Sequence, residues 1–560
     1  MTHTGPDPGG DRKDMSSPSQ ADRIENRSQR SSLESIRLSG LTVQEKKCRL
    51  VNQEIDRQGM GKYQWYIWGL CGFGYMVDLI WAHAFALVLS PLQQELGFGN
   101  GQSGNISTSF NAGLTAGAFV WGYLSDVIGR RWAFNLTCLI SSLFGLCLGA
   151  SNNYTTFLVL TAFVGFGVGG NVPIDTTITL EFLPQNRRFL LACLSVFQPI
   201  GVIISSVVAL AFIPTYSCSP NFSEEGSLPS CVAVTSEDVK CCTRSSNMGW
   251  RYLLFTLGAI TILVFFVRFF VFKFHESPKF LIYQGRDAAA IRTIQAMAKM
   301  NGRVPQLRLE DLTALDESSQ ESYGNDHQLR GLLETKTSWT EGLAHETSRY
   351  RLLFSSFRMT RLTVFTWLTY IMDFWGFTVA GLYLPRILAL KNGAASVSLR
   401  ETYTAYVYTY SPGIIGVLAG AAMYRIPSIG RKWTMMSSAG LMGVSIFLFS
   451  IVDSVPKNEG MFAMEYFFQS MFNAVLYGWT PEAFPAAVRG TACGVASFWG
   501  RLAGIVSPLI AQHLYGRAEN GNGDGDINSV LYLAGGVTLG CVISVALLPN
   551  DLMEAKDEEL

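Results

Sequence analysis

Several ionisable side chains lie within long apolar runs of the sequence. Asp78 and Asp373 lie near the middle of two runs, whereas Glu465 and Arg501 lie in two others. A charge at the middle of a bilayer costs about 3 kcal/mol or more unless it faces a partner or a water-filled cavity. A carboxylate there can couple protonation to conformation and substrate, which we predict for Asp78 and, after it, for Asp373. The alternatives for Asp78 are a structural ion pair with Arg501 or a solvated cavity wall.

Polar and aromatic residues near the middle of such runs are candidates for the lining of a substrate cavity. Gln469 and Asn473 are four residues apart, so a helix places them on one face. Aromatic rings with a few amide groups suit a sugar, a polyol or a flat aromatic metabolite. The alternative is that these side chains pack between helices or face lipid. The predicted lining comprises Gln198, Tyr370, Trp375, Tyr406, Gln469, Asn473 and Arg501.

One spaced pattern of charges occurs twice in the chain, 301 residues apart. Gly129-Arg130-Arg131-Trp132 recurs as Gly430-Arg431-Lys432-Trp433, and Glu181-x-x-Pro184-x-x-x-Arg188 recurs as Glu482-x-x-Pro485-x-x-x-Arg489. Each copy lies between apolar runs. A common offset over the whole stretch is typical of a membrane protein built from two related halves.

We predict that these motifs form a reversible cytoplasmic gate of ion pairs. Asp126 can pair with Arg130 or with a neighbouring helix, because an acid at a membrane end needs a partner. The equivalent position in the second copy is Pro427, so that latch is one-sided or takes its acid from Glu482. The alternative is that the arginines only anchor helix ends. The predicted gate comprises Gly122, Asp126, Gly129, Arg130, Arg131, Glu181, Arg188, Glu482 and Arg489, with Glu181–Arg188 and Glu482–Arg489 as analogous pairs.

The composition indicates a membrane protein. Of 560 residues, 48% are hydrophobic and 15% are charged, whereas soluble domains have about 25% charged residues. Apolar runs long enough to cross roughly 30 Å of hydrocarbon recur along the chain. We predict an all-α membrane protein with twelve transmembrane helices in two pseudo-symmetric six-helix bundles. The runs cover residues 63–89, 105–124, 132–150, 155–178, 189–213, 250–272, 361–384, 401–424, 433–451, 461–481, 488–513 and 529–548.

The loops indicate how the chain crosses the membrane. Arginine and lysine gather in the short loops that carry the two motifs, which places those loops and both termini in the cytoplasm. The loop at residues 214–249 is then external, where thiols can oxidise. We predict at least one disulfide among Cys218, Cys231, Cys241 and Cys242. The sequons at Asn153 and Asn221 lie on the same side and are predicted N-glycosylation sites.

Composition along the chain predicts five segments. These are a disordered cytoplasmic tail (1–60), an N-terminal six-helix bundle (61–273), a cytoplasmic central loop (274–360), a C-terminal six-helix bundle (361–548) and a cytoplasmic tail (549–560). The central loop begins with an amphipathic stretch from Ala288 to Met300. We therefore expect short helices on the cytoplasmic face, followed by a flexible linker.

The motifs resemble those of a known family. Gly122-Tyr-Leu-Ser-Asp126-Val-Ile-Gly129-Arg130-Arg131 is similar to the loop 2–3 motif of the major facilitator superfamily, and Glu276-Ser277-Pro278 with the two Glu-x-x-Pro motifs resembles its sugar porters. Gly167-Val-Gly-Gly-Asn-Val-Pro-Ile-Asp175 is closer to the synaptic-vesicle-protein-2-related branch, most of all to its fungal members. The resemblance implies two rocking bundles whose first helices face a central cavity. The hexose-porter stretch of span seven is replaced by Trp367-Leu-Thr-Tyr370-Ile-Met-Asp373, so a hexose site does not carry over.

These features predict a secondary transporter of the major facilitator type. It would move a small organic solute, sugar-like, carboxylate or aromatic, by alternating access with proton coupling. The six histidines show no HExxH spacing and no nucleotide-binding Gly-x-x-x-x-Gly-Lys motif occurs, so we expect neither an enzyme nor ATP-driven transport. The net charge of zero argues against a nucleic-acid partner. We expect no cofactor and no metal, and a monomer in the plasma membrane. Export of a secondary metabolite or toxin and non-transporting sensing on the same fold are the alternatives.

Overall fold

The computed structural model describes residues 43–549, apart from residues 129, 188, 223–225, 233, 235–239, 272–274, 323–350, 352, 395–396, 427–429, 453, 485–488 and 520–527. Within that part the chain is helical, and its β-structure is limited to one isolated bridge between Ser230 and Cys242.

In the described part of the chain, each predicted span corresponds to one long helix or to two consecutive helical segments. In the first half these helices are α3 (Lys62–Leu96), α4 (Gly104–Ile128), α5 (Arg130–Gly149), α6 (Tyr154–Val168) with α7 (Asn171–Phe182), α8 (Phe189–Leu194) with α9 (Phe197–Phe212), and α10 (Gly249–Phe266) with the π-helical turn η4 (Val267–Val271). In the second half they are α16 (Phe357–Ala394), α17 (Leu399–Tyr410) with α18 (Pro412–Met423), α19 (Gly430–Ile451), α20 (Val455–Ala483), α21 (Arg489–Glu519) and α22 (Asn528–Ala546).

Eight of the helical segments in the described part of the chain are long and apolar enough, by length and composition, to cross a membrane. Helix α17 falls outside that set because it is only 12 residues long, whereas the longer α20 carries buried polar side chains such as Glu465 and Gln469. Polar residues on an inward face lower the mean hydropathy of a span without exposing polar atoms to lipid.

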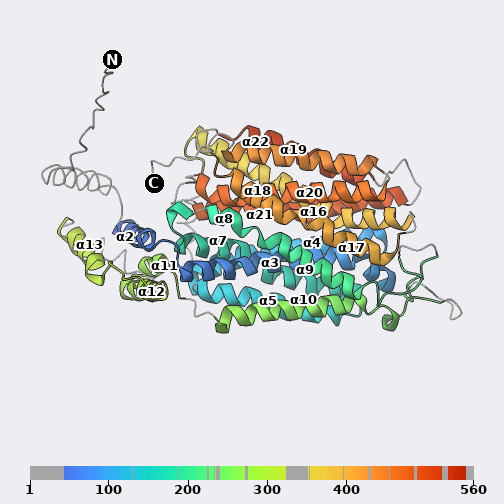
Figure 1. Ribbon diagram of the computed structural model, residues 1–560, viewed down its shortest axis with the longest axis horizontal. Helices are drawn as coiled ribbons and strands as arrows, with labels where there is room; N and C mark the ends of the chain where they lie inside the picture. The colour runs from blue at the N-terminus through green and yellow to red at the C-terminus, as the bar shows by residue number, and fades with distance from the viewer. Residues whose placement is uncertain are drawn as a thin grey trace, which may run out of the picture.

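The two halves form two bundles that lie against each other along their length. Figure 1 shows the first-half helices grouped below the second-half helices, all roughly parallel to the long axis. Contacts between the halves are made by α4 with α21, α9 with α17, and α3 with α16. The predicted architecture of two six-helix bundles is therefore confirmed.

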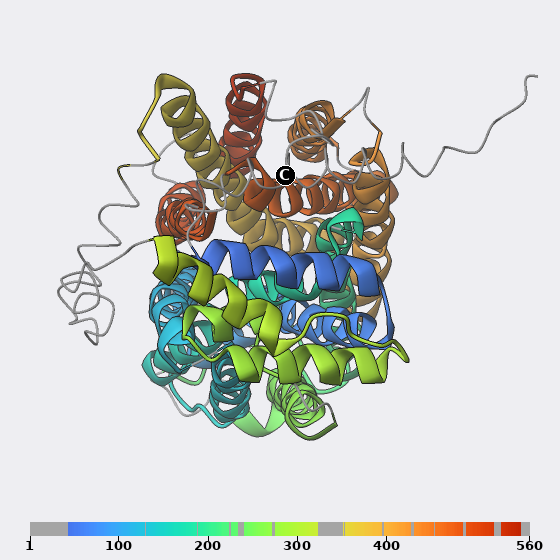
Figure 2. The same cartoon turned by 90° about the vertical axis from the view of Figure 1, so that its left-hand side faces the viewer.

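A group of short helices covers one end of the first-half bundle. We call α2 (Val43–Gln58), α11 (Pro278–Tyr283), α12 (Asp287–Met300) and α13 (Leu309–Ser322) the helical cap. Figure 2 views this end and shows the cap lying over the first half. The expectation of short helices in the central loop holds for α11 to α13. The expectation that residues 43–60 belong to a disordered tail is wrong for α2, because Val51 and Ile55 are buried against α12 and α13 in one apolar cluster.

Ion pairs reinforce the cap. Lys47 of α2 is buried and contacts Asp287 at 2.5 Å and Asp316 at 2.7 Å. Burial disfavours the charged form of Glu54, yet hydrogen bonds from Arg57 (Nη2–Oε1, 2.7 Å) and Gln58 (2.9 Å) outweigh it and lower the pKa of Glu54. Through Lys47, the N-terminal helix is thus attached to the central loop by ion pairs as well as by apolar packing.

The loop between α9 and α10 lies at the opposite end of the molecule (Figure 1). Disulfides join Cys218 to Cys242 and Cys231 to Cys241, which confirms the prediction of a disulfide in this loop. The loop is also bonded to the C-terminal end of α3, where Gln94 Nε2 donates to the Pro220 carbonyl at 3.0 Å.

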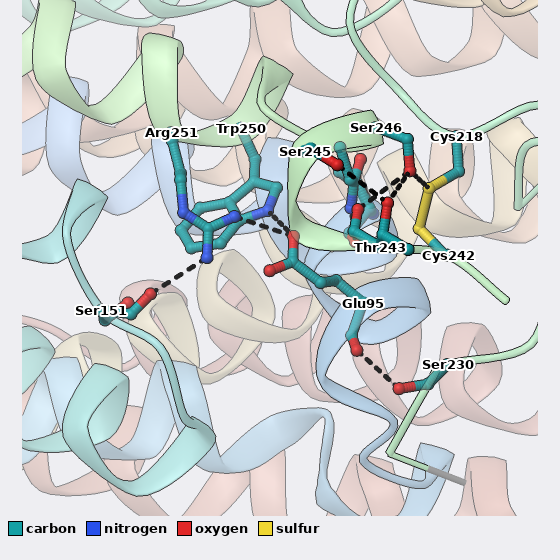
Figure 3. A network of polar contacts seen from close by, with 12 residues as sticks. Glu95, Ser151, Cys218, Ser230, Cys242, Thr243, Ser245, Ser246, Trp250 and Arg251 are labelled. Carbon is teal, nitrogen blue, oxygen red and sulfur yellow. Dashed lines mark hydrogen bonds and ion pairs between the residues drawn. A yellow bond between two sulfur atoms is a disulfide. The ribbon is translucent and has the colours of Figure 1, made fainter. Parts of the chain in front are cut away.

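A buried ion pair fixes the same end of the first bundle (Figure 3). Glu95, near the end of α3, accepts hydrogen bonds from Arg251 Nη1 at 2.8 Å and from Trp250 Nε1 at 2.9 Å. Arg251 also donates to the Ser151 carbonyl at 3.1 Å, and Ser230 Oγ donates to the Glu95 carbonyl at 2.5 Å. Helices α3 and α10 and the disulfide loop are therefore held together.

Candidate functional site

The repeated motifs form one ion pair in each half. Arg130, at the start of α5, pairs with Glu181 near the end of α7. In the second half, Arg431 Nη2 at the start of α19 lies 2.7 Å from Glu482 Oε2 near the end of α20, and Tyr424 Oη donates to the same oxygen at 2.5 Å. Each charged residue in the second pair is 301 positions after its counterpart in the first. The duplication is thus present in the contacts as well as in the sequence.

These pairs differ from the expected gate in their partners. Glu181 was expected to pair with Arg188, but the structure places Arg130 beside it. The expectation that the second copy draws its acid from Glu482 agrees with the Arg431 contact. Gly129 and Arg188, and the side chains of Asp126 and Arg489, lie outside the described residues; Gly122 lies within α4 and Arg131 is exposed at the start of α5.

Both ion pairs join helices of a single half, so neither crosses between the bundles. Glu276, just before α11, accepts weakly from the backbone N–H groups of Arg130 (3.2 Å) and Arg131 (3.4 Å), which attaches the helical cap to the first pair. Between the halves at this end, the Arg425 guanidinium lies 4.5 Å from the centroid of the Phe189 ring. The motif pairs therefore shape each bundle's end, and separate contacts close the bundles against each other.

Asp78 is buried on α3 and has an amide as its partner. Asn171 Nδ2 donates to Asp78 Oδ1 at 2.9 Å. Asn171 is the first residue of α7 and follows the break at Gly169-Gly170, where span four is interrupted. The amide therefore reaches Asp78 from the point at which the helix changes course.

Arg501 does not form the ion pair with Asp78 that was one of the two alternatives to proton coupling. From α21 of the second half it donates Nη1 to the Gly169 carbonyl at 2.9 Å and, more weakly, to the Leu114 carbonyl at 3.3 Å. Both carbonyls belong to the first half, and Arg501 is near enough to Asp78 to interact with it electrostatically. Arg501 thus joins the two bundles at the helix break, which lies directly before Asn171, the partner of Asp78.

A fully buried ion pair, Asp175 with Arg268, escaped the sequence analysis. Arg268 Nη2 lies 3.1 Å from Asp175 Oδ2 and 2.9 Å from the Leu70 carbonyl, and its guanidinium lies 3.9 Å from the centre of the Phe134 ring. A Cβ atom at Gly74 would lie 1.7 Å from Asp175 Oδ2. Only glycine leaves room for this pair beside α3. Arg268 stands near the end of a span, where an arginine is usually read as an anchor.

Asp373 is the second buried carboxylate with an amide partner. With its amide oriented to donate, Asn473 Nδ2 lies 3.1 Å from both carboxylate oxygens of Asp373. Tyr370, one turn before Asp373 on α16, donates its hydroxyl to Thr480 Oγ1 at 3.1 Å. The first and fourth spans of each half thus contribute one carboxylate and one amide, Asp78 with Asn171 and Asp373 with Asn473.

The other predicted lining residues lie on α9, α16, α17 and α20. Tyr406 stacks edge-on against Tyr403 at 5.3 Å, and Gln469 is buried one turn from Asn473. Gln198 and Trp375 are half-buried on α9 and α16. Of the predicted set, the structure brings Asn473 into direct contact with a predicted coupling residue.

The two predicted glycosylation sites differ in exposure. Asn153 is exposed, and its side chain caps α6 by accepting from the Thr156 N–H at 2.7 Å. Asn221 is buried, with 7% of its surface exposed. Asn153 is thus the accessible acceptor in the folded protein.

A duplicated twelve-helix membrane protein with charged pairs at one end and amide-bound carboxylates inside belongs to the class of secondary transporters that work by alternating access. The model of the Major Facilitator Superfamily matches residues 69–508. The chain belongs to the major facilitator superfamily.

Relatives support this assignment over most of the chain. The MFS siderochrome iron transporter 1 of Ceriporiopsis subvermispora is 37% identical over 476 residues, which cover 84% of this chain and 85% of that protein. The major facilitator-type transporter hxnZ of Emericella nidulans is 33% identical over 83% of this chain and 81% of its own length. A solved structure of the proton:xylose symporter XylE bound to 6-bromo-6-deoxy-D-glucose has a TM-score of 0.61 at 15% identity, covers 86% of this chain and 94% of its own, and so shares the fold.

Proposed function

We propose that this transporter couples the movement of a small organic solute to protons through Asp78. The observation that carries the proposal is the pairing of this buried carboxylate with the neutral amide of Asn171. A carboxylate bonded to an amide can gain or lose a proton without first breaking an ion pair. Asp175, in contrast, is bound directly by Arg268, which suits a structural role.

The position of Asn171 links this carboxylate to movement of the bundles. The Gly169 carbonyl, two residues before Asn171, accepts from Arg501 of the other half. Rocking of the bundles that withdraws Arg501 would free the helix break and shift Asn171 relative to Asp78. Protonation of Asp78 also weakens the hydrogen bond from Asn171, because a neutral carboxyl group is a poorer acceptor than a carboxylate. Movement of the bundles would then change the proton affinity of Asp78 through this amide, while the carboxylate itself carries the proton.

The proposed solute class comes from the names of the relatives. Relatives include a niacin transporter of Acinetobacter baylyi at 24% identity and an organic cation/carnitine transporter of Arabidopsis thaliana at 26%, besides the siderochrome transporter. These names share a small organic solute and differ in its charge. We propose a location in the plasma membrane, because the disulfides of the predicted external loop require an oxidising compartment on the export pathway.

The test uses the full-length protein in proteoliposomes with an imposed pH gradient. A panel of radiolabelled sugars, carboxylates and organic amines is first screened in both directions to find a solute that accumulates. Asp78→Asn should retain counterflow exchange of that solute, because exchange needs no net proton movement, and should lose accumulation and its pH dependence. Accumulation by Asp78→Asn with an unchanged pH profile would contradict the proposal and make Asp373 the next residue to test.

Asn171→Leu provides the matched control, because it removes the amide and keeps the carboxylate. A hydrogen bond to the ionised form favours that form. The variant should therefore still accumulate the solute, with its pH profile moved to higher pH. If Asn171→Leu abolished accumulation as completely as Asp78→Asn, the two residues would act together in folding or binding and proton coupling through Asp78 alone would be refuted.

A further inference from the structure

One buried carboxylate in the membrane-spanning helices has no partner in the described part of the chain. Other acids there are bound by arginines or amides: Glu95 by Arg251, Asp175 by Arg268, Glu181 by Arg130, Glu482 by Arg431, Asp78 by Asn171 and Asp373 by Asn473. Glu465 of α20 is 3% exposed, and its Oε1 atom has no hydrogen-bond partner. A buried carboxylate without a partner is costly, so the partner is expected to come from outside the chain.

Glu465 lies deep within the membrane-spanning region. It is ten residues after Val455, the first residue of α20, and eight residues before Asn473. At about 1.5 Å per residue these separations are roughly 15 Å from the outer end of the helix and 12 Å from Asn473. Gln469, one turn deeper on the same helix, also has an unpaired Nε2 atom. Polar atoms without hydrogen-bond partners therefore occur along α20 from Glu465 towards the Asp373–Asn473 pair.

Two tyrosine rings lie close enough to the unpaired carboxylate to interact with it electrostatically. Tyr410, at the end of α17, lies 4.7 Å edge-on from the Tyr466 ring and 5.1 Å from the Phe462 ring, and it is near enough to Glu465 for electrostatic interaction. The Tyr410 hydroxyl is buried and unpaired. Gly413 makes room for this arrangement, since a Cβ atom there would lie 2.4 Å from the Tyr466 ring. A carboxylate beside tyrosine rings is the combination that binds organic cations.

Helix α3 of the first half contacts Tyr410 and, further towards the predicted external loops, Tyr403. His83 of α3 packs edge-on against Tyr410, with ring centroids 4.4 Å apart, and its Nε2 is engaged with Ser206 Oγ at 3.1 Å. One turn further out on α3, the Leu87 carbonyl accepts from the Tyr403 hydroxyl at 2.9 Å. Tyr403 lies two turns before Tyr410 on α17. Separation of Tyr403 from Leu87 would therefore open the region from the outer side.

We propose that Glu465, Tyr410 and Tyr466 form a subsite for the positively charged nitrogen of an organic amine or quaternary ammonium solute. The carboxylate supplies the counter-charge, the tyrosine faces supply cation–π attraction, and Gln469 offers a donor to a second polar group of the same molecule. This subsite rests on the proposed transport function and narrows its solutes to cations.

The test measures binding, so it requires neither a pH gradient nor turnover. The full-length protein in detergent is titrated with choline, N-methylpyridinium and tetraethylammonium, and with 3,3-dimethyl-1-butanol, the uncharged isostere of choline. Wild-type protein should bind at least one cation saturably and the neutral isostere at least tenfold more weakly. Glu465→Gln should weaken cation binding at least tenfold. Tyr410→Phe should retain it and Tyr410→Leu should lose severalfold.

Two control variants show whether the Glu465 charge itself binds the cation. Glu459→Gln changes a carboxylate on the same helix that is already bonded to the Tyr408 hydroxyl, and it should bind cations like wild type. Glu465→Asp keeps the negative charge and replaces Glu465→Gln as the test if that variant does not fold. Glu465→Asp should bind the cations more tightly than Tyr410→Leu does. Unchanged cation binding in Glu465→Gln, equal binding of the neutral isostere, or failure of wild-type protein to bind any of the three cations would overturn the subsite. A wild-type protein that still accumulates a solute in an Asp78-dependent way would then retain the proposed function.

Discussion

Removing the Arg268 side chain should destabilise the protein more than any exposed charge change. Arg268→Met leaves the Asp175 carboxylate buried at zero exposure, and it also removes the donors to the Leu70 and Phe134 carbonyls at 2.9 and 3.2 Å. Breaking a buried pair from one side costs about 3–5 kcal/mol, because an uncompensated charge remains. Asp175→Asn should cost less, roughly 2 kcal/mol, since Arg268 keeps its two carbonyl acceptors and the amide oxygen still accepts.

The measurement is the free energy of unfolding of the purified protein, followed by tryptophan fluorescence during titration of mild detergent micelles with dodecyl sulfate. The double variant Asp175→Asn/Arg268→Met should lose at least about 1 kcal/mol less than the sum of the single losses, because it contains no unpaired charge. Arg57→Gln, which breaks a pair at a side chain that is 39% exposed, is the matched control and should change stability by about 1 kcal/mol or less. The reasoning is refuted if Arg268→Met stays within about 1 kcal/mol of wild type, or if the single losses add.

Three further outcomes are expected. Glu482→Gln should raise maleimide labelling of the half-buried Cys193 on α8 severalfold, because the loss of the Arg431 contact loosens the end of α20 beside α8. Labelling is measured by peptide mapping, and unchanged labelling would show that the Arg431–Glu482 pair does not help to close the bundles. Asn153→Gln should remove a glycosidase-sensitive mobility shift that Asn221→Gln leaves in place, and the reverse result would contradict the exposure argument. Glu54→Gln should make α2 more susceptible to proteolysis above the ordinary pKa of a glutamate. That difference from wild type should disappear as the pH falls through the lowered pKa of Glu54, because the protonated acid loses the same hydrogen bonds; a difference that persists at low pH would count against them.

The spacing of the motifs predicted which charges take part at the gate, but not which of them touch. Proximity in the chain predicts a pair of Glu181 with Arg188. Arg130 begins one span and Glu181 ends the next, so both lie at the same end of adjacent antiparallel helices. Alternation of spans alone brings these two ends together. Sequence proximity was therefore a weaker guide to the contact than topology.

Contacts made by neutral or terminal residues were harder to predict. Asn171 carries no charge that would mark it within an apolar run, and its role becomes visible only when the break at Gly169 turns the amide towards Asp78. Arg268 lies at the end of a span, where sequence reading assigns an anchor. The helix α2 had a usable signal that was overlooked, since Cys48, Val51 and Ile55 recur at helical spacing on its buried face.

At the common offset of 301 residues, some charged residues are present in both halves and others in only one, and the two groups differ in the role that we assign to them. The gate pair Arg130–Glu181 is repeated at 301 residues as Arg431–Glu482, and both copies form the same contact. Three buried charges do not follow this rule, because the equivalent position in the other half is apolar. Asp175 corresponds to Leu476, but it is paired with Arg268 inside its own bundle. Glu465 corresponds to Val164 and Arg501 to Ile200, and neither has such a partner among the described residues. An element that both halves need is present twice, as expected for a device that shapes each bundle end. A charge that serves the solute, the proton or the contact between unlike bundles needs only one copy. By this argument Glu465 and Arg501 belong with the asymmetric functions of the transporter, and an apolar residue installed at either should impair transport while leaving the two gate pairs intact.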